Sequence, residues 1–164
     1  MGNKRSGIVV EGEPDGNPKG TTILPATHLR LNGEHGILFS GIVDSNTVLR
    51  ADTVESNSLA GIRLERGTQH LLVQPRVVSR NGTGLELEGR SVSHNRLIVS
   101  ASNSRGDGAV IRGAAENEFE LTVLQNQSNG MFVAGGVSNT FLLTATSNRR
   151  AGAMLTEGAV GNVI

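Results

Sequence analysis

Arginine and glutamate residues recur at matching offsets in three short segments of this 164-residue chain. The segments read GIRLE, GLELE and GAVIR, and apolar residues alternate with other residues in each. Alternation places the charged side chains of a strand on one face, and neighbouring strands of a sheet lie about 4.8 Å apart. Five charged residues are therefore expected to form one compact cluster: Arg63, Glu65, Glu86, Glu88 and Arg112.

The residue types of this cluster suit a groove for an acidic polymer. Arginine neutralises carboxylates, and glutamate serves as a general acid or base. We predict Glu86 and Glu88 as candidate catalytic residues, and Arg63 and Arg112 as candidate substrate-binding residues. The alternative interpretation is structural, because opposite charges on adjacent strands also stabilise and solubilise an exposed sheet.

A second candidate cluster combines two histidines with an arginine. The stretch GTQHLLVQPRVV contains His70 and Arg76 and is the least regular part of the middle of the chain, and His94 lies one repeat further on. A histidine pair beside arginine suits proton abstraction next to a carboxylate. We therefore predict His70 as a catalytic candidate and Arg76 and His94 as substrate-binding candidates. Alternatively, His70 replaces an asparagine in a structural column and His94 points to solvent.

The composition argues against several other kinds of chemistry. The chain has no Cys, which excludes disulfides and thiolate metal sites, and it shows no His-x-x-x-His spacing, so no metal site or cofactor is expected. Fifteen basic residues balance fifteen acidic ones, and Trp and Tyr are absent, so nucleic acid and membrane are not expected partners. No signal peptide is visible, and a secreted, cell-surface or virion location stays open.

The elements that carry these residues repeat along the whole chain. Seven segments have the form Gly-apolar-x-apolar-x, and their spacing falls from 29 to 22 residues. This alternation predicts strands that bury one face, and a fixed repeat of strands indicates a solenoid whose coils pair in parallel. The leading glycines are Gly7, Gly36, Gly61, Gly84, Gly108, Gly130 and Gly152.

Asparagine recurs in two columns between the predicted strands. Asn and Gly tolerate the left-handed conformations of turns, and stacked Asn side chains form hydrogen bonds from coil to coil. Both columns are therefore predicted to be structural. One column contains Asn46, His70, Asn95, Asn117, Asn139 and Asn162, and the other contains Asn57, Asn81, Asn103, Asn126 and Asn148, with Asn3 in an equivalent place.

These repeats resemble the right-handed parallel β-helix family, the pectate-lyase-like superfamily, whose turn Asn and strand-opening Gly recur in the same way. The resemblance implies an all-β, right-handed parallel β-helix of about six to seven coils, with an irregular first coil over 1–35 and regular coils over 36–164. A leucine-rich repeat is the alternative fold, but its Asn follows the first leucines more closely than it does here.

The resemblance also implies a function. The family includes lyases, epimerases, hydrolases, phage spikes and non-catalytic modules, so we expect a polysaccharide-binding or polysaccharide-processing domain. The alternative is a non-catalytic scaffold or homo-oligomeric assembly module, or a fragment of a longer β-helix, because neither end shows a polar cap. An outward apolar stripe of Val110, Phe132 and Met154 is the predicted interface with a second copy or an adjoining segment.

Overall fold

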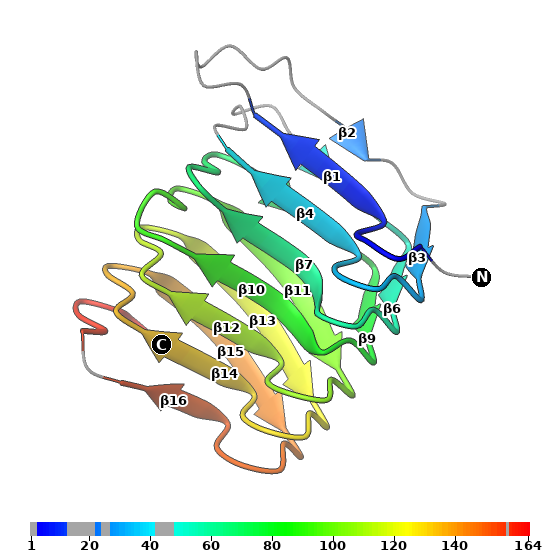
Figure 1. Ribbon diagram of the computed structural model, residues 1–164. Coiled ribbons are helices and arrows are strands. Elements are labelled where there is room, and N and C mark those ends of the chain that lie inside the picture. The colour runs from blue at the N-terminus through cyan, green and yellow to red at the C-terminus, as the bar shows by residue number, and fades with distance from the viewer. Residues whose placement is uncertain (1–2, 13–21, 24–26, 42–47, 157) are drawn as a thin grey trace.

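The computed structural model describes residues 3–12, 22–23, 27–41, 48–156 and 158–164. Within these ranges the chain is all-β without a helix, and its parallel strands stack as a β-solenoid (Figure 1). The predicted all-β solenoid is therefore confirmed. No helix long and apolar enough to cross a membrane occurs in the described part of the chain.

The first sheet contains seven parallel strands, one from each successive coil. Its strands pair residue for residue, so that each predicted outward column forms as expected. Arg63 faces Glu86, and Glu65 faces Glu88. In chain order the strands are β1 (Ile8–Glu11), β4 (Ile37–Ser40), β7 (Ala60–Glu65), β10 (Thr83–Glu88), β12 (Ala109–Arg112), β14 (Met131–Ala134) and β16 (Ala153–Leu155).

The second sheet changes its character along the solenoid axis. In the early coils it consists of pairs of short strands, namely β2 (Thr22–Ile23), β3 (His28–Arg30), β5 (Val48–Leu49), β6 (Thr53–Glu55), β8 (Leu72–Val73) and β9 (Val77–Ser79). In the later coils each pair is replaced by one continuous strand, namely β11 (Arg96–Ser102), β13 (Glu118–Leu124) and β15 (Thr140–Thr146). Both β8 and β9 pair with β11, so the sheet changes from pairs of short strands to single continuous strands at β11.

Two asparagine ladders join the coils at the turns. In each ladder the backbone N–H and the side-chain Nδ2 of one Asn donate to the Oδ1 of the Asn in the next coil. All of these bonds run in one direction, from the earlier coil to the later one. One ladder contains Asn95, Asn117, Asn139 and Asn162. The other contains Asn3, Asn32, Asn57 and Asn81, then Ser104, whose backbone N–H donates to Asn126, and finally Asn126 and Asn148.

Two predicted ladder members are placed one residue away from the ladder. His70 aligns with His94 rather than with Asn95, whose Oδ1 instead accepts a hydrogen bond from the backbone N–H of Leu71. Asn103 is exposed, and Ser104 takes the ladder position. The displaced residues have φ of 55° and 54°, the left-handed turn conformation that immediately precedes each ladder position. Asn46 lies outside the described residues.

The core lies between the two sheets and consists of their inward aliphatic columns. The inward residues Ile62, Leu85 and Ile111 are fully buried, and the rings of Phe119 and Phe141 stack with centroids 4.7 Å apart. Leu155 is 42% exposed, because β16 is the edge strand of its sheet.

Candidate functional site

The predicted charged cluster forms on the outer face of the first sheet. Arg63 Nε lies 3.0 Å from Glu65 Oε2, its Nη1 lies 3.1 Å from Glu86 Oε2, and its Nη2 contacts Glu88. Arg112 Nη1 lies 3.2 Å from Glu86 Oε1. We call these five residues the Arg/Glu cluster, and the proximity predicted for them is confirmed.

The arginines of the Arg/Glu cluster are paired with its three glutamates. Every nitrogen of the Arg63 guanidinium faces a carboxylate of the same chain. Burial lowers the pKa of Arg63, but Glu86, Glu65 and Glu88 outweigh burial and place that pKa above its usual value. A carboxylated polymer would have to displace these partners to reach Arg63. The roles predicted for Glu86, Glu88, Arg63 and Arg112 stay predictions.

A buried histidine lies beside this cluster. The Nδ1 of His35 accepts a hydrogen bond from the backbone N–H of Ala60 at 3.1 Å, so its ring is held as the neutral tautomer that carries the proton on Nε2. Burial, followed by the positive charge of Arg63, lowers the pKa of His35. His35 therefore resists protonation in the folded protein.

The predicted histidine pair also forms, at a turn beside the second sheet. The rings of His70 and His94 stack with centroids 5.3 Å apart, and His94 Nε2 lies 2.8 Å from Glu116 Oε2. Arg76 is not part of this group, contrary to the prediction, because the extended chain through β8 carries it away to a separate depression. Among the described residues, no group of three or more His, Asp or Glu could hold a metal ion.

The predicted apolar stripe is only partly open. Val110, Phe132 and Met154 share one column, as expected. Val110 is nevertheless only 3% exposed, and the guanidinium of Arg112 lies over the half-buried Phe132 ring, 5.8 Å from its centroid. Met154, at 45% exposed, is the one member that is largely open. The interface role of the stripe stays a prediction.

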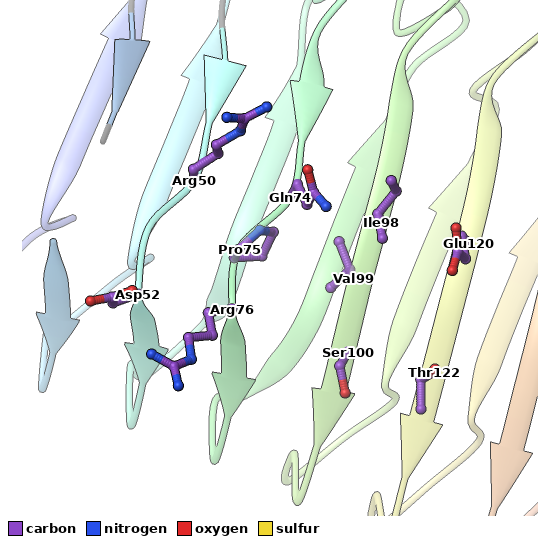
Figure 2. Close-up of a pocket in the computed structure, with 10 residues that line it drawn as sticks. All are labelled: Arg50, Asp52, Gln74, Pro75, Arg76, Ile98, Val99, Ser100, Glu120 and Thr122. Atoms are coloured by element: carbon purple, nitrogen blue, oxygen red, sulfur yellow. The ribbon is translucent and has the colours of Figure 1, made fainter. Parts of the chain in front are cut away.

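One depression of the described surface was not predicted as a unit. It lies on the outer face of the second sheet and has a volume of about 680 Å³ (Figure 2). Arg76 was the one lining residue singled out from the sequence. We call this depression the hollow, and it is lined by Arg50, Asp52, Gln74, Pro75, Arg76, Ile98, Val99, Ser100, Glu120 and Thr122.

The hollow forms where broken strands meet a continuous one. Gln74, Pro75 and Arg76 separate β8 from β9, and Arg50 and Asp52 lie in the equivalent break between β5 and β6. Proline cannot donate to a ladder of backbone hydrogen bonds, so it interrupts a strand. Pro75 within the apolar stretch LLVQPRVV is the sequence signal that pointed to this break.

The hollow differs from the Arg/Glu cluster in whether its arginines form ion pairs. The side chains of Arg50 and Arg76 are exposed, and no ion pair or side-chain hydrogen bond joins either of them to a residue that the structure describes. The amide of Gln74 and the hydroxyls of Ser100 and Thr122 line the same space. Two cations thus line the hollow, together with these neutral hydrogen-bonding groups and the carboxylates of Asp52 and Glu120.

Comparisons with family models, with curated proteins and with solved structures gave no match for this chain. The β-solenoid itself is established by the paired strands. Membership of the pectate-lyase-like superfamily stays a prediction from the repeat pattern.

Proposed function

We propose that this protein binds an acidic polysaccharide in the hollow of its second sheet. The observation that carries the proposal is the pair of arginines, Arg50 and Arg76, that have no anionic partner among the described residues. Guanidinium groups bind carboxylates through charge-assisted hydrogen bonds. The volume of the hollow, about 680 Å³, lies in the range of small-molecule and sugar sites.

The other lining residues favour a sugar polymer over a nucleic acid. Ser100, Thr122 and Gln74 supply donors and acceptors for hydroxyl groups. Glu120 lies in the same space, where its carboxylate accepts hydrogen bonds from hydroxyls. The hollow contains no aromatic residue on which a base would stack.

A more specific proposal is that the protein also processes the polysaccharide that it binds. The resemblance to the pectate-lyase-like superfamily supports a lyase, epimerase or hydrolase activity. Of the residues predicted to act as acid or base, Glu86 and Glu88 lie on the first sheet and His70 lies at a turn, so none of them lines the hollow. Binding is therefore the activity that the hollow itself supports.

The test compares binding of polygalacturonate, alginate and neutral dextran by the wild type and by the double variant Arg50→Ala/Arg76→Ala. We expect selective binding of the two polyuronates, which weakens with salt and falls at least about tenfold in the double variant. Arg66→Ala is the matched control, because it removes an exposed arginine that pairs with Glu65 on the first sheet. Equal affinity of the double variant and the wild type would overturn the proposal.

A second candidate function, self-assembly as a scaffold, is favoured by the apolar residues around the last strand. Met154 and Leu155 of β16 are 45% and 42% exposed, and Leu142 on β15 is 69% exposed. We propose a second copy of the chain as their partner. Sedimentation at increasing protein concentration tests this proposal, with association expected for the wild type and reduced in Leu142→Asp. A monomer at every concentration contradicts it.

A further inference from the structure

We propose that the break opposite β11 is itself a recognition element, in which main-chain groups of Ile98 and Ser100 bind the ring hydroxyls of a uronic-acid sugar. This inference rests on the proposed polysaccharide function and names the ligand class. The register of the strands creates the break. Leu97 pairs with Val73 and Ala101 pairs with Val78, so residues 74–77 lie opposite only residues 98–100. The earlier coil contains one extra residue, which makes a bulge.

The bulge provides no backbone donor for β11. Pro75 has no N–H, the N–H of Arg76 donates to Ala51 O at 2.9 Å, and the N–H of Val77 donates to Asp52 O at 3.1 Å. Arg76 and Val77 therefore both direct their N–H groups back to the preceding coil. No backbone hydrogen bond joins residues 74–76 to residues 98–100.

The alternation of the strand identifies which groups of β11 face the bulge. The N–H of Arg96 donates to Leu71 O of the preceding coil at 2.9 Å. Because peptide groups alternate between the two edges of a strand, the N–H and C=O groups of Ile98 and Ser100 point to that same edge. The regular pairs on either side use the Ile98 N–H and the Ser100 C=O, which leaves the Ile98 C=O and the Ser100 N–H beside the bulge.

The opposite edge of β11 shows that the interruption is local. All seven of its residues pair in continuous register with β13. The ladder is also continuous on the other side of the bulge, where the N–H of Gln74 donates to Leu49 O at 2.8 Å. Figure 2 shows Gln74, Pro75 and Arg76 across from Ile98, Val99 and Ser100, with the hollow between them.

The two open main-chain groups define the ligand chemistry. A hydroxyl donates to the Ile98 C=O and accepts from the Ser100 N–H, whereas an ionised carboxylate only accepts. An anion alone would lie unfavourably against the Ile98 C=O, while Arg50 and Arg76 favour a carboxylate nearby. A sugar ring that carries both hydroxyls and a carboxylate satisfies both demands. The ligand class is therefore a polyuronate rather than a polyanion without hydroxyls.

Ser100→Pro, compared with Ser100→Ala, tests the main-chain contact, because both variants lose the hydroxyl and only Ser100→Pro also loses the N–H that the proposal assigns to the ligand. We expect Ser100→Pro to fold, although proline within a central strand normally breaks the ladder. Its affinity for polygalacturonate is expected to fall about five- to tenfold relative to Ser100→Ala, as for one lost hydrogen bond. Thr122→Pro is the matched control, since Thr122 is the partner of Ser100 in the continuous ladder, and that variant is expected not to fold.

Amide hydrogen exchange provides a test that does not depend on a variant. The Ser100 N–H is expected to exchange rapidly in the free wild type and to become protected with polygalacturonate. Slow exchange in the free protein would show that this N–H is already paired and would overturn the inference.

Poly-glutamate separates the inference from the proposed function. We expect it to bind at least about tenfold more weakly than polygalacturonate, because it offers carboxylates without ring hydroxyls. Binding of both polymers with equal affinity, together with unchanged affinity of Ser100→Pro, would overturn the inference but leave the arginine-based function standing. Failure of the wild type to bind any polyuronate would overturn both.

Discussion

The side chains of single residues at the turns carry much of the stability of this solenoid. Asn117 is 1% exposed, and its side chain accepts from Asn95 and donates to Asn139 and to Val92 O. Asn117 thus satisfies backbone groups of its own coil and of the preceding coil, and it bonds the asparagine side chain of the following coil. A buried polar group that loses its partner costs about 1–3 kcal/mol, so an interruption of the ladder affects more than one coil.

We expect Asn117→Ala to lower the free energy of unfolding by about 2–4 kcal/mol, because the buried N–H of Asn95 loses its acceptor. Denaturant unfolding measures the change. Gln125→Ala is the control, since Gln125 is an exposed turn residue with φ of 53° and is expected to change stability by less than about 0.5 kcal/mol. Equal effects of the two substitutions would contradict a special role for the ladder.

His35 gives the stability a dependence on pH. Its pKa in the folded protein lies below the ordinary value of 6.5, so the unfolded state binds a proton more readily. The stability contributed by neutral His35 is complete above about pH 6.5 and falls as the pH decreases towards the folded-state pKa. We expect His35→Gln, which still offers an acceptor to Ala60, to lose this slope. The difference between wild type and variant, measured from pH 7.5 to pH 5, isolates His35 from the other histidines, and a constant difference would rule the assignment out.

At the scale of the elements, the leading glycine of each coil allows the strands of the two sheets to approach closely. A Cβ on Gly84 would lie 2.5 Å from both the Ala101 Cβ and the Gly108 carbonyl oxygen. The same position in the last coil is open, because a Cβ on Gly152 would meet only the Ala145 Cβ, at 3.3 Å.

This contrast predicts that Gly84→Ala destabilises the protein by about 1–3 kcal/mol, because the rigid backbone and a core alanine must move apart. Gly152→Ala is the matched control and is expected to cost well under about 1 kcal/mol. Thermal unfolding of the two variants provides the comparison. A larger cost at Gly152 than at Gly84 would show that close packing is not what selects glycine here.

The elements also show what the sequence could predict. The outward columns of the first sheet were predicted correctly, because apolar alternation and the leading glycines fix their register. The ladder positions of His70 and Asn103 were wrong by one residue, because polar residues occupy both the left-handed turn position and the ladder position beside it. The hollow was not predicted, because it depends on one extra residue that is visible only when Val73 and Val78 are paired with β11.

At the scale of the whole molecule, each coil is stabilised by the coil on either side of it. Residues of the middle strands, such as Leu87 and Ile111, are fully buried, whereas Leu155 of the edge strand β16 is 42% exposed. Solenoid stability is approximately a sum over coils and their neighbouring interfaces. Protection is therefore expected to vary along the axis.

We expect amide hydrogens of β10 and β12 to exchange at least about 100-fold more slowly than those of β16, because opening of the edge strand disrupts only one interface. Hydrogen exchange followed by mass spectrometry of peptides measures the gradient. Uniform protection from β10 to β16 would indicate instead that the whole solenoid opens as one cooperative unit.

The uniform direction of the asparagine ladders gives the solenoid an electrical polarity. In every bond between two ladder asparagines the donating Nδ2 belongs to the earlier coil and the accepting Oδ1 to the later one, so the dipoles of these bonds add along the axis. The sum resembles the macrodipole of an α-helix, with its positive pole on the side of the later coils. An all-β protein thereby acquires an axial field that its strands, as sheets with only small net dipoles, would not supply.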